Sequence, residues 1–599
     1  MTKKMHAWSL AALPLAIGLA SFAGSAQAVS FNIGDVQAQF DSQLSIGASM
    51  STQSADKRFI SVQNGGEAAA RTSDDGRQNY QAGDVFSKIF RGVHDLELNY
   101  GDSGAFLRGK YWYDFETKDG SQRFYDIDDS GRAPLVKGSG TALLDAFVYH
   151  NYSIGNNPGN VRLGRQVVSW GESTFIGNSI NSINPVDVAA FRRPGAEIKE
   201  GLLPVEMLYF SQGLTDNLSM EAFYQLKWAP FAIDNCGTFF GSDTLAVGCN
   251  DRLVVAGVDN PQGQQPSAST IVRARKDRDA SDDGQFGVAF RYFVPQLNDT
   301  ELGFFAMNYH SRSPIYSSIA GVPPGLGTPI TGIDGGAGPA GYFFEYPEDI
   351  RLYGMSFQTN LGGTAVSGEV SYRPNMPMQI STGDQSRTAL VNAFLGQDNT
   401  HRGLSVGVGD EIPGYVRKEF YQAQVTAIHF IERVLGASRL SLVGEAGVNY
   451  IGGLGDTTKF GRDSLFGQSP FVEGDGGGAV PGQCSSFQGT PVGGSPNAAS
   501  WCENDGFYTE WSSGYRVRAQ LDYSNVIAGI NLSPNLTWSH DVDGYGPNFT
   551  ENAKAISVGL NADYGNKYNA SLSYTDFFDG KYNTNVDRDF LALSVGVSF

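Results

Sequence analysis

The chain has few residues whose type and spacing suggest catalysis. Its histidines are scattered, and no H-E-x-x-H motif occurs. A lipid hydrolase would need a serine beside a histidine, and His94, His150 or His429 could supply the ring. Lone histidines on strands more often serve packing. We therefore expect no enzyme, no catalytic residue and no cofactor.

Four cysteines form two pairs, each close in sequence: Cys236 with Cys249 and Cys484 with Cys502. In an oxidising compartment such pairs predict two disulfides, each closing one loop. No histidine lies between the members of either pair, so the spacing does not favour zinc. The stretch 126–131 begins like a calcium loop, but a lysine stands where the bidentate glutamate is needed. We expect no metal site, with a weak loop calcium as the alternative.

The segment 171–202 is too apolar for a loop in free solvent, and it continues into a run of charges. We expect it to fold into the barrel and line an apolar solute path beside a charged constriction. The alternative is a loop that packs on its neighbours at the mouth of the structure. The candidate path residues are Trp170, Glu172, Phe175, Ile176, Phe191, Arg192 and Arg193.

The N-terminus predicts export. Lys3 and Lys4 precede an apolar run over residues 7–23, and a small-x-small triplet follows at 26–28. A basic start, a short apolar stretch and such a triplet are typical of a secretory signal. We expect residues 1–28 to be a signal peptide and residues 29–599 to form the mature protein.

The elements that must position these residues are strands. After residue 28 no apolar run is long enough to span a membrane as a helix, so any spans must be strands of a closed barrel. From Val36 to Met50, apolar and polar residues alternate with period two, and the same alternation ends the chain. The composition agrees, with 75 Gly, 38 Phe and 27 Tyr.

The alternating stretches number about 18, with 14 or 16 as alternatives, because bacterial barrels normally have an even number of strands. The alternation is blurred at 203–211 and 301–310. Short turns alternate with long connections, and both cysteine pairs fall in long ones. Outer-membrane barrels have short periplasmic turns and long outer loops. We therefore expect an all-β transmembrane antiparallel barrel with 171–202 as a lumen plug.

The chain ends on an aromatic residue. Phe599, preceded at alternating positions by Val597 and Val595, resembles the terminal signal of Gram-negative outer-membrane barrels, which their assembly machinery reads. The alternative is an edge strand of a β-sandwich. The expected partners are that machinery and the lipid and lipopolysaccharide of a Gram-negative outer membrane. A net charge of −19 argues against nucleic acid as a partner.

Several short stretches together resemble a family of large Gram-negative outer-membrane proteins long catalogued only as a domain of unknown function. The stretches are Gly164–Gln166, Trp170–Ser173, Asn184–Pro185, Pro194–Pro204 and Gly368–Arg373. The resemblance implies uptake of alkanes, steroids and related compounds. It also implies a companion periplasmic lipoprotein and, for some members, an inner-membrane transporter. More distantly, the family is similar to the long-chain fatty-acid channel.

Our leading hypothesis is a monomeric outer-membrane barrel through which hydrophobic small molecules of alkane, fatty-acid, steroid or aromatic type diffuse. Two alternatives stay open. One is a porin for polar solutes, and the other is a structural or adhesive surface barrel whose loops bind partners. The large share of the chain in long loops favours a gated path over an open pore.

Overall fold

The computed structural model describes residues 29–194, 198–249, 252–256, 269–321, 340–395, 399–401, 404–406, 409–470, 501 and 503–599. The predicted signal peptide and the predicted pair of Cys484 and Cys502 lie outside these residues. Among the described residues, no helix is both long enough and apolar enough to cross a membrane.

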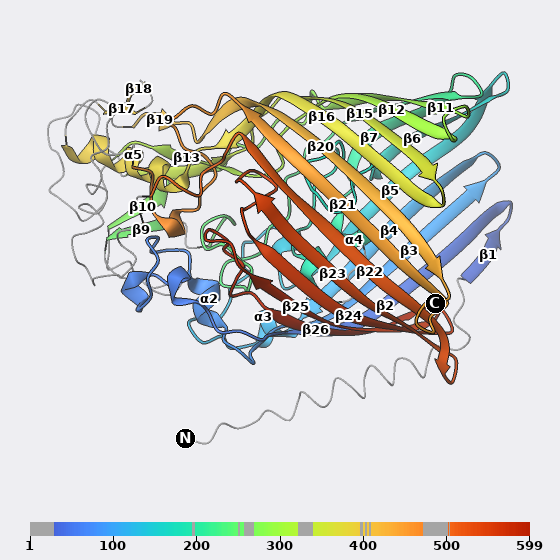
Figure 1. Cartoon of the computed structure of the whole chain (residues 1–599), viewed down its shortest axis with the longest axis horizontal. Coiled ribbons are helices and arrows are strands. Elements are labelled where there is room, and N and C mark those ends of the chain that lie inside the picture. Colours follow the sequence, from blue (N-terminus) through green and yellow to red (C-terminus); the bar gives the residue numbers. More distant parts are fainter. Residues whose placement is uncertain are drawn as a thin grey trace.

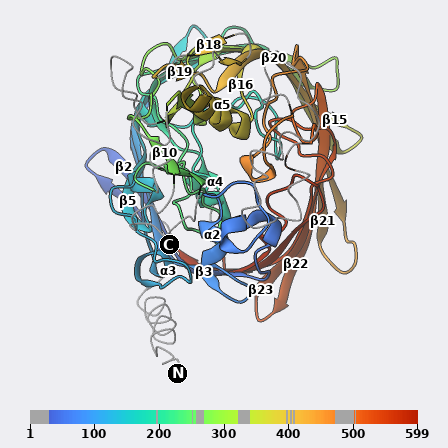
Figure 2. The ribbon, with the colours of Figure 1, turned by 90° about the vertical axis from the view of Figure 1, so that its left-hand side faces the viewer.

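Eighteen antiparallel strands close into one barrel (Figure 1), and from the loop end they form a ring (Figure 2). The predicted strand number is therefore confirmed, and the two blurred stretches are strands β7 and β12. The barrel strands are β2 (Val36–Ser51), β3 (Val85–Tyr100), β4 (Ser103–Asp114), β5 (Ser139–Ile154), β6 (Asn157–Gln166), β7 (Val205–Gly213), β8 (Leu218–Gln225), β11 (Phe286–Val294), β12 (Thr300–Tyr309), β15 (Ile350–Leu361), β16 (Thr364–Gln379), β20 (Tyr415–Glu432), β21 (Arg439–Gly452), β22 (Trp511–Ile527), β23 (Ile530–Asp543), β24 (Lys554–Tyr564), β25 (Tyr568–Phe578) and β26 (Phe590–Ser598).

The two ends of the chain close the barrel. Strand β26 pairs with β2 from Ser598 opposite Gln43 to Phe590 opposite Ser51. The backbone N–H of Phe599 donates to the carbonyl of Ser42 at 2.8 Å, and the N–H of Ser42 donates to the carbonyl of Phe599 at 2.6 Å. Strand β1 (Val29–Ile33) pairs with β2 beyond the end of β26. Closure satisfies the ladder groups that an open edge would leave unpaired.

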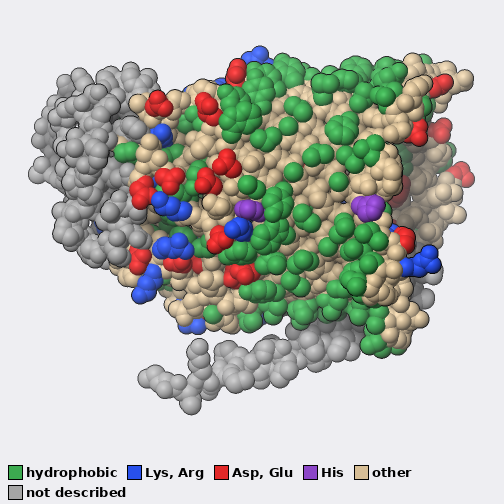
Figure 3. Space-filling view, viewed as in Figure 1, with side chains coloured by type: hydrophobic (Ala, Val, Ile, Leu, Met, Phe, Trp, Pro, Cys, Tyr) green, Lys and Arg blue, Asp and Glu red, His purple; other side chains and the backbone are tan. Residues whose placement is uncertain are grey.

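The two faces of the strands differ as their alternation predicts. On β26, Leu593 and Val595 are each 50% exposed on the outside, whereas Ser594 is 3% exposed on the inside. The outer surface carries a broad area of hydrophobic side chains between the two ends of the barrel (Figure 3), and charged groups gather toward the loop end. Such a belt matches the hydrocarbon layer of a membrane.

Long loops form a cap at one end of the barrel, and short turns join the strands at the other (Figure 1). The cap contains secondary structure that the sequence pattern did not predict. Strands β9 (Arg252–Ala256), β10 (Ser269–Arg273), β13 (Ile315–Ile319), β14 (Gly341–Glu345) and β19 (Glu411–Ile412) form one sheet, and β17 (Asn399–His401) pairs with β18 (Leu404–Val406). The helices are α2 (Asp75–Asn79), α3 (Phe115–Asp119), α4 (Ile198–Gly201) and α5 (Thr382–Leu395), with 3-10 turns η1 (Lys57–Phe59), η2 (Val62–Asn64), η3 (Pro134–Val136), η4 (Ala190–Arg192) and η5 (Ser464–Phe466).

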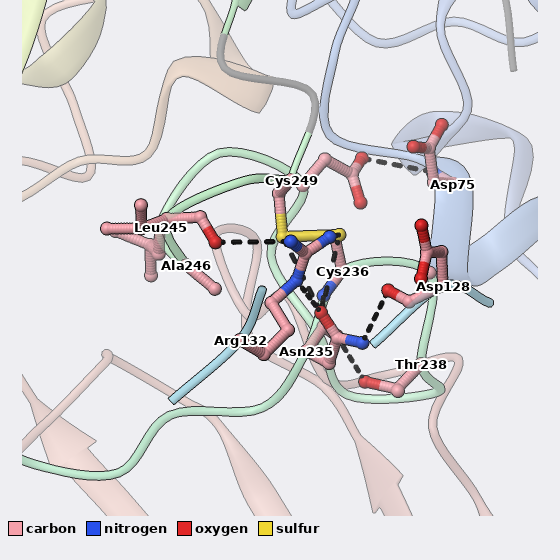
Figure 4. Close-up of a disulfide and its surroundings, with 12 residues drawn as sticks. Asp75, Asp128, Arg132, Asn235, Cys236, Thr238, Leu245, Ala246 and Cys249 are labelled. Carbon is pink, nitrogen blue, oxygen red and sulfur yellow. Dashed lines mark hydrogen bonds between the residues drawn. A yellow bond between two sulfur atoms is a disulfide. The ribbon is translucent and has the colours of Figure 1, made fainter. Parts of the chain in front are cut away.

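The predicted disulfide between Cys236 and Cys249 is present in the loop that follows β8 (Figure 4). The Arg132 side chain lies against it. Its Nε donates to Asn235 Oδ1 at 2.7 Å, and its Nη1 donates to the carbonyl of Val247 at 3.2 Å. One arginine thus joins the disulfide loop to the loop between β4 and β5.

Candidate functional site

The connection between β6 and β7 turns back into the barrel, and we call its residues 171–202 the inner segment. Helix α4, near its end, lies within the ring of strands in both views (Figures 1 and 2). Asn184 divides the inner segment into two lobes. Its Nδ2 donates to the carbonyls of Gln166 and Leu203 at 3.1 and 3.0 Å, so the chain returns to the ends of β6 and β7 between the lobes.

Two glutamates of the barrel wall hold the backbone of the first lobe, residues 171–183. Glu445 of β21 accepts hydrogen bonds from three consecutive backbone N–H groups, those of residues 174–176, at 2.9, 2.6 and 2.8 Å. Glu369 of β16 accepts from the N–H groups of Glu172 at 2.6 Å and Ile180 at 2.9 Å. Both carboxylates are buried. Hydrogen bonds to a charged acceptor are the strong kind, so these contacts fix the lobe against the wall.

Other wall side chains hold the carbonyls of the same lobe. Arg373 of β16 donates to the carbonyl of Ser179 at 2.8 Å, and its Nε donates to the hydroxyl of Tyr309 at 2.8 Å. Gln422 of β20 donates to the carbonyl of Gly177 at 2.9 Å. The wall therefore satisfies both donors and acceptors of a backbone that has no regular structure of its own.

The apolar residues of the first lobe pack on one side of the lumen. Trp170 and Ile180 belong to a buried cluster with wall residues that include Met207, Phe305 and Leu352. Trp170 and Ile176 are 0% and 4% exposed, whereas Phe175 is 36% exposed. Of these three candidate path residues, only Phe175 presents a ring to solvent.

The second lobe, described over residues 185–194 and 198–202, contacts the opposite strands. Glu200 pairs with Arg91 of β3 at 2.7 Å, and Asp187 pairs with Lys110 of β4 at 3.3 Å. All four side chains are buried, and removing one member of such a pair would leave an uncompensated charge. The two lobes thus touch wall strands that lie far apart around the ring.

Arg192 and Arg193 lie in the second lobe. Arg192 pairs with Asp234 at 2.7 Å and stacks over Phe240, 4.5 Å from the ring centroid. Arg193 lies 5.8 Å from the ring centroid of Trp112. Burial raises the pKa of Asp234, although both arginines oppose the shift. The side chain of Phe191 lies outside the described part of the structure.

The inner segment covers one side of the lumen and leaves another side open to water. Inward-facing side chains of β7, β11, β15, β16, β20 and β21 are almost fully buried: Met207, Ala289, Leu352, Ser371, Gln422 and Glu445. Inward-facing side chains of β23, β24 and β25 keep part of their surface: Thr537, Ser557, Asn561, Ser571 and Ser573. We call this second group the uncovered wall, and its side chains are all small and hydrophilic.

Glu172 is the titratable group of the first lobe. Burial raises its pKa to about 7, and Glu301 and Glu369 add to the shift while Arg291 opposes it. Arg291 is itself paired with Glu301 at 3.0 Å and with Glu221 at 3.0 Å. The charge of Glu172 therefore changes near neutral pH.

The sequence did not reveal the wall residues that hold the inner segment. Glu369, Arg373 and Asn184 nevertheless fall in the stretches that carry the family resemblance. A further signal was available, because Glu445 is the one charge on the inward face of β21 after the first residue of that strand, and Glu369 shares its inward face with Arg373 alone as a second charge. Nothing in the strand pattern said which loop each carboxylate would meet.

The histidines considered for catalysis lie on barrel strands beside hydroxyl groups. His94 Nδ1 is 2.8 Å from Ser42 Oγ, His150 Nδ1 is 2.9 Å from Ser103 Oγ, and His429 Nδ1 is 2.9 Å from Thr364 Oγ1. Each pair joins residues directly opposite on neighbouring strands. Strand pairing alone accounts for these contacts.

One acidic group in the described part of the chain has ligand atoms within 4.8 Å of one another, that of Asp74, Asp75 and Asp243 in the outer loops. Asp243 already accepts a hydrogen bond from the Asp75 backbone N–H at 3.1 Å. In the stretch 126–131, Asp126 accepts from the Gln122 N–H at 3.1 Å and Asp128 from the Ser130 N–H at 2.8 Å. These are local loop contacts.

A closed eighteen-strand barrel with a loop folded inside defines a porin-like β-barrel of the outer-membrane type. The chain belongs to the family described as "Protein of unknown function (DUF1302)", whose model matches residues 9–599. No curated protein matches it in sequence.

Several solved structures are similar to the chain at low identity. OccAB1 of Acinetobacter baumannii is 10% identical with a TM-score of 0.39, over 96% of this chain and 98% of that one. OccK2 (OpdF) of Pseudomonas aeruginosa, in complex with glucuronate, is 9% identical with a TM-score of 0.37, over 94% and 97%. The outer membrane channel DcaP of Acinetobacter baumannii is 10% identical with a TM-score of 0.35, over 95% and 100%. Similarity this low gives no information on the solute of the present chain.

Proposed function

We propose that the protein is a passive channel of the Gram-negative outer membrane, in which small solutes pass between the inner segment and the uncovered wall. The observation that carries this proposal is the asymmetry of the lumen. One set of inward side chains is sealed by the inner segment, while Thr537, Ser557 and Ser573 of the other set remain in contact with solvent. In this proposal the inner segment acts as a plug that narrows the pore.

The lining of this path favours solutes with polar groups. Serine, threonine and asparagine side chains offer both donors and acceptors, so a solute can exchange its water for wall contacts without one strong binding step. Arg518 of β22 adds a cation whose hydrogen bond goes to the neutral Gln520 at 3.2 Å. Weak contacts at many positions allow entry and release.

A channel for hydrophobic solutes is the second candidate, and one observation favours it. An apolar groove of about 750 Å³ lies on the lipid-facing wall, where its lining includes Met355, Phe357 and Val425. Gly447 also lines this groove, and a Cβ atom at Gly447 would lie 2.7 Å from Ile176 of the first lobe. An apolar solute could collect from the membrane at this thin part of the wall.

The proposed channel would be exported, assembled and embedded in the outer membrane. Residues 1–28 would direct export, Phe599 with Val597 and Val595 would be read by the barrel assembly machinery, and the barrel would act as a monomer in lipid and lipopolysaccharide. A periplasmic lipoprotein and an inner-membrane transporter would be companions, as the family resemblance implies.

The test is reconstitution of the purified protein into planar bilayers and into solute-loaded vesicles. The proposal expects a steady ion conductance and swelling of vesicles in small polar solutes. Transfer of a fluorescent fatty acid without ion conductance would favour the hydrophobic candidate instead. An inserted barrel that passes neither class of solute would contradict both and leave a structural role.

A further inference from the structure

A cavity of about 350 Å³ lies between the second lobe and strands β25 and β26. It opens onto the proposed solute path, because Ser571 and Ser573 of the uncovered wall line one side. Arg192 and Arg193 line the facing side, and the ring of Phe240 lines another. The cavity therefore brings together cations, hydroxyl groups and an aromatic surface, and its volume suits a small organic molecule.

The cavity carries an excess of positive charge. Arg192 is neutralised by Asp234 at 2.7 Å, with the Asp234 side chain 16% exposed. The guanidinium of Arg193 has no ion pair or hydrogen bond among the described residues. It lies over the ring of Trp112 and is near enough to Asp234 to help lower the pKa of that carboxyl. Of the described carboxylates of this lobe, Asp187 is already paired with Lys110 and Glu200 with Arg91. Within the described parts of the chain, one guanidinium therefore has no paired carboxylate and can meet an anion from outside.

The apolar side of the cavity is rigid. The ring of Phe240 packs edge-on against Phe590 at 5.8 Å, against Phe86 at 6.0 Å and against Phe239 at 4.9 Å. Phe590 lines the same cavity. Rings fixed in this way offer a preformed surface to an apolar body and lose little entropy when they are covered.

The hydroxyl side can complete the recognition of an anion. Ser571 Oγ lies 2.7 Å from Ser594 Oγ, and Thr575 Oγ1 donates to Ser557 Oγ at 3.0 Å. The hydroxyl of Ser573 makes no hydrogen bond within the described residues and is free to donate. A carboxylate accepts from hydroxyl and guanidinium donors alike.

We propose that this cavity binds monoanions that carry a ring-sized apolar body, such as alicyclic or aromatic monocarboxylates, and so sets a solute preference of the channel. The inference rests on the proposed function, because the cavity lies on the proposed path. A neutral solute would leave Arg193 without a counter-charge. An inorganic anion would leave the aromatic surface uncovered.

The test is calorimetric titration of the full chain in detergent with cyclohexanecarboxylate, with the matched neutral cyclohexanecarboxamide, and with sulfate. Saturable binding of the carboxylate and at least about tenfold weaker binding of the other two are expected, since one charge-assisted contact is worth that factor. Equal binding of the amide or of sulfate would overturn the inference, as would no binding of the carboxylate.

Variants assign the binding to the cavity. Arg193→Gln should weaken carboxylate affinity about tenfold, and Arg193→Lys should keep most of it because the charge remains. Arg439→Gln, which removes an exposed cation at the turn end of β21, should leave affinity unchanged. Equal affinity in Arg193→Gln and the native chain would overturn the assignment.

The same preparations are measured in planar bilayers. A protein that conducts ions but does not bind the carboxylate would refute this inference and leave the channel standing. A protein that does not conduct would refute the channel function, whatever it binds. The two failures are therefore distinguishable.

Discussion

At the residue scale, the lumen depends on a few carboxylates that accept backbone N–H groups. Glu445 and Glu369 together receive five such bonds from the first lobe. A backbone N–H group is the same whichever side chain the loop residue carries. The wall glutamates therefore fix the path of the loop backbone and depend little on the side chains of the first lobe. A glutamate is suited to this task because each of its oxygens accepts two hydrogen bonds.

Replacing one of these carboxylates should loosen the first lobe. Glu445→Gln puts an amide donor where the N–H groups of residues 174–176 need acceptors, and each lost bond to a charged acceptor is worth about 1.5–3 kcal/mol. We expect a larger or noisier single-channel conductance from a barrel that still folds. Glu419→Gln on the outer face of β20 is the matched control. Identical conductance in all three proteins would contradict the role of Glu445.

Glu172 predicts a pH dependence. Its pKa is raised from 4.5 to about 7, first by burial, so the folded state holds a proton that the unfolded chain has released between those values. The contribution of Glu172 to the free energy of unfolding is therefore fully present below about pH 4.5 and is lost as the pH rises through about 7. We expect conductance and thermal stability to change across this window in the native chain and much less in Glu172→Gln. A variant with the same pH profile as the native chain would count against this assignment.

At the scale of elements, the inner segment is two lobes pinned at Asn184. The base of the first lobe is narrow, because Asn181 Nδ2 donates to Ser169 Oγ at 2.9 Å. The lobe can therefore be shortened without stretching the chain between β6 and β7. Each lobe can then be tested separately.

Deletion of residues 171–180, which joins Trp170 to Asn181, should widen the path. The deletion removes the groups that Glu369 and Glu445 hold but leaves Asn184 and the second lobe in place. We expect larger conductance and faster swelling of vesicles in small sugars. Heat-dependent mobility in gel electrophoresis checks that the barrel has formed. A folded deletion variant with native conductance would show that the first lobe does not narrow the pore.

At the scale of the whole molecule, closure and the apolar belt act together. Eighteen paired strands leave no open edge, and the side chains that point outward are the ones that lipid can cover. The chain between the strands is long enough to build a cap with its own sheet and to send one loop inside. A barrel with a partly filled lumen results from the same fold that satisfies the backbone hydrogen bonds of the strands.

Neighbouring positions on β24 test which face meets lipid. Leu560 is 40% exposed on the outside, whereas Asn561 faces the lumen. Leu560→Arg should lower the free energy of unfolding by about 2–4 kcal/mol if the site lies near the middle of the bilayer, and Asn561→Arg by much less. Urea unfolding in lipid vesicles measures both. Equal losses would contradict the assigned orientation.

The sequence by itself determined the barrel. Period-two alternation and the turns between strands are local properties, so they predicted about eighteen strands, with 14 or 16 as alternatives, together with the inner and outer faces and the order of long and short connections; the structure has eighteen. The disulfide of Cys236 with Cys249 also followed from nearness in sequence. The secondary structure of the cap was missed, because its short strands lack that alternation and pair only through tertiary contacts.

Only the tertiary structure decided what fills the lumen. The amides of Glu172 and Thr174 meet carboxylates 197 and 271 residues further along the chain, and no local pattern encodes such a meeting. The apolar residues of the segment were visible in the sequence, but which of them would be sealed on the wall was not. Ile176 is buried and Phe175 is exposed because the wall offers a recess at Gly447 to one and solvent to the other. The type of a side chain decides whether burial is favourable, and the shape of the closed barrel decides where that side chain can be buried.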